Sequence, residues 1–109
     1  MQDKLGELEL YVLLAAASLG DDAYAVSIAR EIHEQTGRRI HRATIYVTLQ
    51  RLEKKGLVAS YLGEPLPQRG GKARRLVQVQ PAGIAALERT RTALSRLWLR
   101  LDRRQLEAR

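Results

Sequence analysis

The segment spanning residues 42–79 constrains the fold of this 109-residue chain more than any other part of the sequence. Its first part contains Ile45, Leu49 and Leu52, whose i, i+4 and i+7 spacing places them on one face of an α-helix. Gly56 follows and tolerates the left-handed conformation in which helices commonly end. The spacing therefore predicts a helix that ends near Gly56 and is held by one apolar face. The residues on its other face are Ala43, Tyr46, Val47, Gln50 and Lys54.

Two strands are predicted after this helix. Residues 57–62 are rich in strand-compatible side chains, and residues 75–80 alternate polar with apolar beyond Leu76. The segment between them, 63–74, is too long for a tight hairpin turn and too polar to be buried. Helix, strand, exposed cationic loop and returning strand are the outline of a winged helix-turn-helix.

Two further helices are predicted before this segment. Apolar residues at helical spacing predict a helix over 6–19, and its wide apolar sector indicates cover on more than one side. A second stripe over 25–32 predicts a helix that ends at Gly37, with Asp21 and Asp22 placed to cap its start. Residues 38–41 are expected to form a short extended strand. The first two helices then form a platform that presents the third.

A longer helix is predicted at the C-terminus. Pro81 is acceptable in the first turn of a helix, and the residues from 82 to about 104 favour one. Its apolar residues follow steps of three and four over about two and a half heptads, short of the roughly 3–4 that establish a coiled coil. Its own domain or a second subunit must cover this seam, and its terminal place favours the second. The predicted homodimer interface is Leu5, Leu8, Leu87, Leu94, Trp98 and Leu101.

Charge is unevenly distributed along the chain. Residues 1–37 carry a net charge of −5, residues 38–75 carry +8, and residues 76–109 carry +4, which gives +7 in total. Cations gathered on one predicted helix and one predicted loop indicate a surface directed at a polyanion, with nucleic acid as the leading partner. The predicted architecture is mainly α with a small β-hairpin (α+β). Residues 1–80 would form a winged helix-turn-helix DNA-binding domain, and residues 81–109 a dimerisation helix.

Several classes of function are disfavoured by composition and spacing. The chain has no cysteine, which excludes disulfides and thiolate chemistry. His33 and His41 lack ligand spacing, and neither has a recognisable nucleophile partner. Gly70 and Gly71 lie in a loop between strands, so they do not form a phosphate-binding cradle. We expect no metal, no cofactor and no enzymatic activity. Without an export signal or an apolar run of about 20 residues, a cytoplasmic protein with no membrane partner is expected.

Four segments, in order, resemble the PadR family of bacterial transcriptional regulators: residues 5–10, 22–25, 44–58 and 70–75. The segment 44–58 is the most specific part, and the chain length is that of short members with one C-terminal helix. The resemblance implies a homodimeric winged-helix DNA-binding protein, generally a repressor. Four positions depart from the family pattern, and two of them remove good helix N-caps. These positions are Ala25, His41, Leu76-Val77 and Gln80.

The basic helix is expected to enter the major groove of DNA. There Gln50 can pair with adenine and Arg51 with guanine, whereas Thr44 and Tyr46 suit phosphate contacts through their hydroxyls. Cations of the loop and its stem, including Arg75, are expected along or within the minor groove. The predicted DNA-binding residues are Arg42, Thr44, Tyr46, Val47, Gln50, Arg51, Lys54, Arg69, Lys72 and Arg74.

Alternatives remain at several of these positions. The basic helix and loop also fit an ordinary solvated surface, and Tyr46 also fits a core aromatic. Trp98 on the predicted seam can line a site for a small aromatic effector, although packing is its simpler role. A protein-interaction module or a nonspecific nucleic-acid-binding module is the alternative to a sequence-specific regulator. RNA recognition is less favoured, because single-stranded RNA readers usually expose more aromatic residues.

Overall fold

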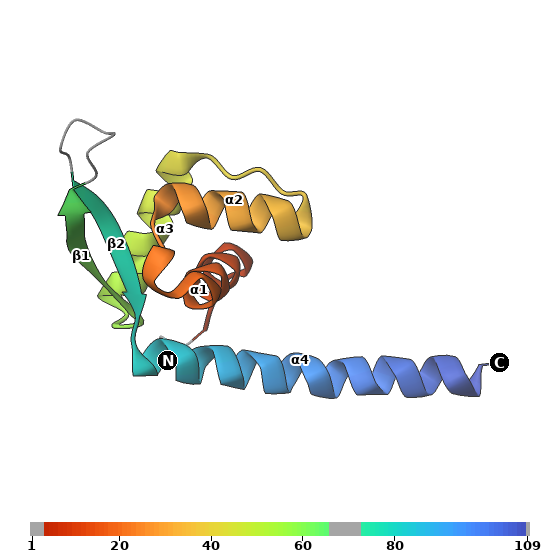
Figure 1. Cartoon of the computed structure of the whole chain (residues 1–109). Helices are drawn as coiled ribbons and strands as arrows, with labels where there is room; N and C mark the ends of the chain where they lie inside the picture. Colours follow the sequence, from red (N-terminus) through yellow and green to blue (C-terminus); the bar gives the residue numbers. More distant parts are fainter. Residues whose placement is uncertain (1–3, 66–72, 109) are drawn as a thin grey trace.

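The computed structural model describes residues 4–65 and 73–108, and it confirms the predicted fold class. Two antiparallel strands form a hairpin beside three helices, and a long C-terminal helix extends past them (Figure 1). The elements are α1 (Glu7–Leu19), a 3₁₀ turn η1 (Gly20–Asp22), α2 (Ala25–Thr36), α3 (Arg42–Lys54), β1 (Val58–Pro65), β2 (Ala73–Val79) and α4 (Pro81–Glu107).

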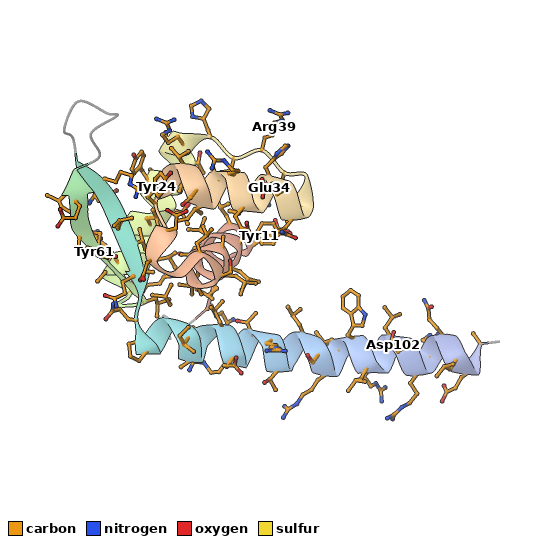
Figure 2. The ribbon with its side chains drawn as sticks, viewed as in Figure 1. Tyr11, Tyr24, Glu34, Arg39, Tyr61 and Asp102 are labelled. Atoms are coloured by element: carbon orange, nitrogen blue, oxygen red, sulfur yellow. The ribbon has the colours of Figure 1, made fainter. Side chains whose placement is uncertain are left out.

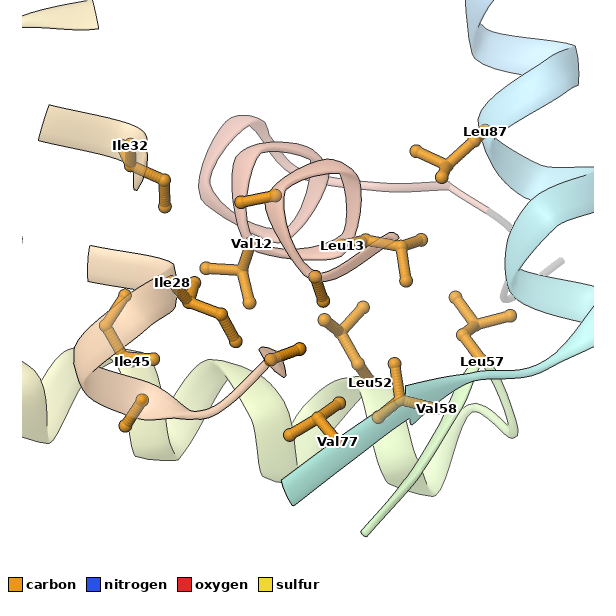
Figure 3. Packing of buried hydrophobic residues seen from close by; sticks show 14 of the residues in the cluster. Val12, Leu13, Ile28, Ile32, Ile45, Leu52, Leu57, Val58, Val77 and Leu87 are labelled. Atoms are coloured by element: carbon orange, nitrogen blue, oxygen red, sulfur yellow. The ribbon is translucent and has the colours of Figure 1, made fainter. Parts of the chain in front are cut away.

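The core is built around α1, which contacts α2, α3, β2 and α4. Val12 and Leu13 of this helix are fully buried and face different neighbours, which explains why its apolar sector is wide (Figure 3). Ile28 of α2 and Ile45 of α3 meet them in the same cluster. Burial of four large aliphatic side chains at about 1.5–3 kcal/mol each supplies much of the force that holds the three helices together.

The helix ends follow the residues that the sequence singles out. Gly37 and Gly56 both adopt φ 76°, the left-handed conformation that ends α2 and the turn after α3. Helices α3 and α4 begin after His41 and Gln80, and neither of these residues makes a side-chain capping hydrogen bond. The departures from better caps therefore leave both helix starts in place.

The residue that caps α2 differs from the prediction. Asp21 and Asp22 lie in the 3₁₀ turn, and neither side chain caps the helix. Instead the backbone N–H of Tyr24 donates to Ser27 Oγ at 3.0 Å, and Ser27 Oγ donates to the Asp22 carbonyl oxygen at 2.6 Å. The hydroxyl can do both because it is a donor and an acceptor, whereas a carboxylate only accepts.

The hairpin pairs β1 with β2 alone. Its register runs from Val58 opposite Val79 to Leu62 opposite Arg75, with an irregularity before Pro65. The strand expected over 38–41 is absent, and that segment is an irregular connector. Beside β2 lies the turn between α1 and α2, where the Ala23 carbonyl oxygen accepts from Val77 N–H at 2.8 Å. The strand prediction for 38–41 was wrong because this segment pairs with neither strand of the hairpin, although His41 itself is extended at φ −64° and ψ 142°.

Helix α4 has a buried beginning and an exposed remainder. Gly83, Ala86 and Leu87 are buried against the rest of the domain, whereas residues 91–108 are all exposed. The core thus continues beyond residue 80 into the first turns of α4. The molecule measures 61 × 30 × 21 Å because the rest of this helix projects from the domain (Figure 1). None of the helices in residues 4–65 and 73–108 is long and apolar enough to cross a membrane.

An ion pair joins the start of α1 to the end of α3. Lys55 Nζ lies 2.9 Å from both carboxylate oxygens of Glu9, whose Oε1 also accepts from Gly6 N–H at 2.9 Å. Burial raises the pKa of Glu9, but the hydrogen bonds from Gly6 and Lys55 outweigh it, so the pKa lies below its ordinary value. The Lys55 ammonium therefore stabilises the contact between the start of α1 and the end of α3.

Glu9→Gln is expected to lower the free energy of unfolding at pH 7 by about 1–2 kcal/mol, since a charge-assisted hydrogen bond is removed. Because the folded pKa of Glu9 is depressed, this stabilisation is fully present above the unfolded pKa of about 4.3 and is lost as the pH falls from there through the lower pKa of the folded state. Urea unfolding at pH 7 and at acidic pH measures this difference. A destabilisation that is the same at both would contradict the assignment.

Candidate nucleic-acid interface

The face of α3 that points away from the core carries the predicted recognition residues. Successive residues turn by about 100° around a helix, so Ala43, Val47, Gln50 and Lys54 form its outermost row. All four are exposed. Arg51 and Thr44 lie on one flank of this row, and Arg42 and Tyr46 lie on the other. The seven predicted positions of α3 are therefore all accessible to a partner.

Two residues of α3 refine the division between its faces. Thr48 is buried beside Ile45 and Leu52, and its Oγ1 donates to the Thr44 carbonyl oxygen at 2.8 Å. A threonine can be buried in this way because the preceding turn of its own helix accepts its hydroxyl. Tyr46 is 48% exposed, which rejects the alternative of a core aromatic.

A groove of about 360 Å³ separates α3 from the hairpin. Tyr46, Gln50 and Glu53 line its helix side, and Ser60 and Arg75 line its strand side. The Ser60 hydroxyl donates to Glu53 Oε1 at 3.3 Å across this groove. The recognition helix and the wing therefore form the two sides of one concave surface, connected at its floor by a polar contact.

The basic residues of the wing do not all have the same surroundings. Arg75 is exposed and lines the groove. Arg74 is only 26% exposed, because its guanidinium lies over the Tyr24 ring, 4.6 Å from its centroid, and 3.6 Å from Asp22 Oδ1. Tyr24 lies at the start of α2, on the side toward the hairpin (Figure 2). The predicted contacts Arg69 and Lys72 lie outside the described residues.

The exposed cations on this surface come from two elements. Arg42, Arg51 and Lys54 belong to α3, and Arg75 belongs to β2. Arg38, which precedes them, pairs with Glu7 at 2.9 Å and lies over the Tyr11 ring on α1. Arg42, Arg51 and Lys54 thus lie on and beside the outer row of α3, and Arg75 lies on the strand side of the groove, which suits a polyanion that follows both.

The predicted interface residues fall into two groups. Leu94, Trp98 and Leu101 are exposed on the projecting part of α4, with Trp98 at 63%. Leu5 and Leu8 pack partly against the core of their own domain. Leu87 differs from both groups, because it is only 8% exposed where the second turn of α4 lies over the core, and its place in a dimer interface stays a prediction.

A second groove, of about 530 Å³, lies between α1 and α4. Its apolar lining includes Leu10, Leu14 and Ala17 of α1 and Ile84, Leu87 and Leu94 of α4. Leu14 is 53% exposed although its neighbours Val12 and Leu13 are fully buried. The apolar seam on the projecting half of α4 is therefore continuous with this groove through Leu94.

Residues 13–89 of the chain match the transcriptional regulator PadR-like family. The chain belongs to this family. PadR-like proteins are DNA-binding transcriptional regulators.

This PadR-like protein is similar to the transcriptional regulator Rv3488 of Mycobacterium tuberculosis, with 36% identity over 92 residues that cover 83% of this chain and 78% of the relative. Its fold matches that of a PadR family regulator from Clostridium difficile R20291, at 21% identity and a TM-score of 0.74, covering 90% and 97% of the two chains. It also matches BpsR of Bordetella bronchiseptica, at 22% identity and a TM-score of 0.64, covering 88% of this chain and 64% of the other.

Sequence reasoning did not identify every residue that shapes this PadR surface. Glu53 was not placed in the groove, although its position seven residues after Tyr46 puts the two on the same flank of α3. Leu97 was not assigned to the seam, and Leu14 was placed in the apolar sector of the first helix without being distinguished as exposed. Only the packed structure separates the leucines that the core covers from those it leaves exposed.

Proposed function

We propose that this PadR-like protein is a sequence-specific repressor that binds a palindromic operator as a homodimer. The observation that carries the proposal is the outer row of α3, where Val47, Gln50 and Lys54 are exposed and Gln50 also lines the groove whose far side carries Arg75. A helix presented in this way fits the major groove of DNA, and the wing then reaches the adjacent backbone or minor groove. A dimer bound to an operator represses by occupying DNA that the transcription machinery needs.

Base recognition is assigned to the outer row. Gln50 lies at its centre and can make the bidentate hydrogen bonds that distinguish adenine, and Val47 can contact a thymine methyl group. Arg51 lies on the flank, where a guanine contact requires the helix to tilt in the groove; otherwise it meets phosphate. Thr44, Tyr46 and Lys54 complete the backbone contacts.

The homodimer is proposed from the uncovered apolar surface. The projecting half of α4 exposes Leu94, Leu97, Trp98 and Leu101 at i, i+3, i+4 and i+7, which is the spacing of a helix–helix seam. A second copy of α4 is the occupant that fits, because its own seam supplies the complementary apolar stripe. Two such helices would also cover Leu14 and the groove between α1 and α4.

A small aromatic effector is proposed for the same region. Trp98 is the only tryptophan of the chain and lies on the seam, so two copies in a dimer can line a flat apolar site. BpsR, which shares this fold, has its DNA binding regulated by 6-hydroxynicotinic acid. A ligand that binds one spacing of the two α4 helices better than another would shift the recognition helices and change operator affinity.

Selection of bound sequences from a random duplex pool tests the function. We expect two inverted half-sites whose centres lie about 10–10.5 base pairs apart, or a multiple of that distance. Binding to the selected duplex should weaken steeply with salt and exceed binding to random DNA by about 10³-fold or more. Equal affinity for both duplexes would instead favour a nonspecific nucleic-acid-binding module, and no binding to either would favour a protein-interaction module.

Titration with flat aromatic compounds, followed by Trp98 fluorescence, tests the effector site. Saturable quenching is expected for a compound that also lowers operator affinity, and Trp98→Leu should abolish the inhibition while the dimer persists. A panel of planar carboxylates and amines with no saturable effect on fluorescence or on operator binding would reject the site and leave Trp98 as a packing residue.

A further inference from the structure

Two neighbouring arginines at the start of β2, Arg74 and Arg75, have the same charge but different surroundings. Consecutive residues of a strand point to opposite faces, so the two side chains cannot serve the same surface. Arg75 lies opposite Leu62 in the register and lines the groove beside α3 together with Gln50 and Tyr46. Arg74 points to the turn between α1 and α2 instead.

Two groups hold the Arg74 guanidinium in place. The Tyr24 ring lies 4.6 Å below it, a distance at which a cation is attracted by the ring face. Asp22 Oδ1 lies 3.6 Å from its Nη1. Arg74 Nε is buried without a hydrogen-bond partner among the described residues, so the ring stack and the ion pair are what orient the group.

The same turn also holds the backbone of β2. Val77 N–H donates to the Ala23 carbonyl oxygen at 2.8 Å, one residue from Tyr24 and three residues along the strand from Arg74. Tyr24 is itself fixed, because its N–H donates to Ser27 Oγ in the first turn of α2. One backbone hydrogen bond and one side-chain clasp therefore connect the wing to the start of α2. The clasp consists of the Arg74 guanidinium stacked on the Tyr24 ring and paired with Asp22.

We propose that Arg74 is a positioning residue that sets the wing against α2, and that Arg75 is the cation of this pair that contacts the DNA backbone. This inference rests on the proposed DNA binding and reassigns the role that the sequence suggested for Arg74. Loss of the clasp removes a side-chain contact at the start of β2 and leaves the Val77–Ala23 bond and the packing of Val58 and Val77 in the core, so the start of β2 moves more freely and the wing meets DNA less often in the productive position.

Charge-retaining substitutions distinguish the two roles. Arg75→Ala is expected to lower operator affinity on the order of 10-fold and to flatten the log–log salt slope by about 0.9 for each phosphate that the variant no longer neutralises, whereas Arg75→Lys retains most of the affinity. Arg74→Ala and Arg74→Lys should both lower affinity, because lysine keeps the charge but lacks the planar guanidinium that stacks on Tyr24. Rescue by Arg74→Lys would overturn the positioning role.

A double-mutant cycle with Tyr24→Leu provides a second criterion. Arg74→Ala should cost much less affinity in the Tyr24→Leu background than in the parent, because that background has already lost the ring stack and keeps only the Asp22 ion pair. An Arg74 that contacts phosphate directly would cost the same in both backgrounds, and that additivity would refute the inference.

Hydrogen exchange keeps the two proposals separable. The backbone amides of the hairpin should exchange faster than in the parent in Arg74→Ala and Tyr24→Leu, and at the parent's rate in Arg75→Ala. This measurement needs no DNA. Unaltered exchange in Arg74→Ala would overturn the clasp even if DNA binding were established. Faster exchange in a protein that binds no duplex would reject the proposed function and leave the anchoring of the wing intact.

Discussion

Leu94→Glu combined with Leu101→Glu is expected to convert the proposed homodimer into monomers and to lower operator affinity by about 100-fold or more. Both side chains are exposed in the single subunit, at 49% and 46%, so charge at these positions does not disturb the core. Across a dimer seam the carboxylates would lie in an apolar contact beside their counterparts, which is strongly unfavourable. Separated subunits no longer have the effective concentration that lets two recognition helices bind as one unit.

Leu99→Glu is the matched control for this experiment. Leu99 lies on the same projecting stretch of α4 and is 62% exposed, but the helical repeat places it about 140° from the seam. Analytical ultracentrifugation and duplex binding should find the control dimeric and active. A double variant that remains dimeric, or monomers that bind the operator as tightly as the parent, would show that α4 does not join the subunits.

Gly83→Ala is expected to destabilise the protein by about 1–3 kcal/mol and to weaken operator binding. In an exposed helix the same change stabilises by up to about 1 kcal/mol, because alanine favours helix. Here a Cβ would clash with the Leu57 carbonyl oxygen and would lie 2.9 Å from Val79 Cγ1, so α4 must move away. Leu57 also accepts from Gln80 N–H at 2.9 Å, and it follows directly on the turn that ends α3. Displacement of α4 therefore strains the connection to the recognition helix.

Ala93→Gly on the projecting half of α4 calibrates this result. It measures the helix propensity term alone, since residue 93 is exposed, and it should lower stability by about 1 kcal/mol. Thermal unfolding and operator binding of both variants give the comparison. A Gly83→Ala protein that is more stable than the parent would mean that the space between α4 and Leu57 accommodates a methyl group, which would contradict the prediction.

The local elements could be predicted because their signals are short-range. The i, i+4, i+7 series of α3 and the left-handed glycines at 37 and 56 depend only on neighbouring residues, and the structure agrees with them. The exposed row with Gln50 and Lys54 followed from the same periodicity. The prediction of a strand over 38–41 was wrong, because whether an extended segment joins a sheet depends on which segments lie beside it in space.

The sequence by itself determined which residues form helices and strands, which face of α3 stays outside, and that cations gather on the recognition helix and wing, because periodicity and charge are properties of the chain. Only the tertiary structure decided that Leu87 is covered while Leu94 is not, and that Arg74 clasps Tyr24 while Arg75 lines the groove. In both pairs the two residues have the same chemistry. Their surroundings differ because packing places distant segments of the chain against one residue of each pair and leaves the other exposed.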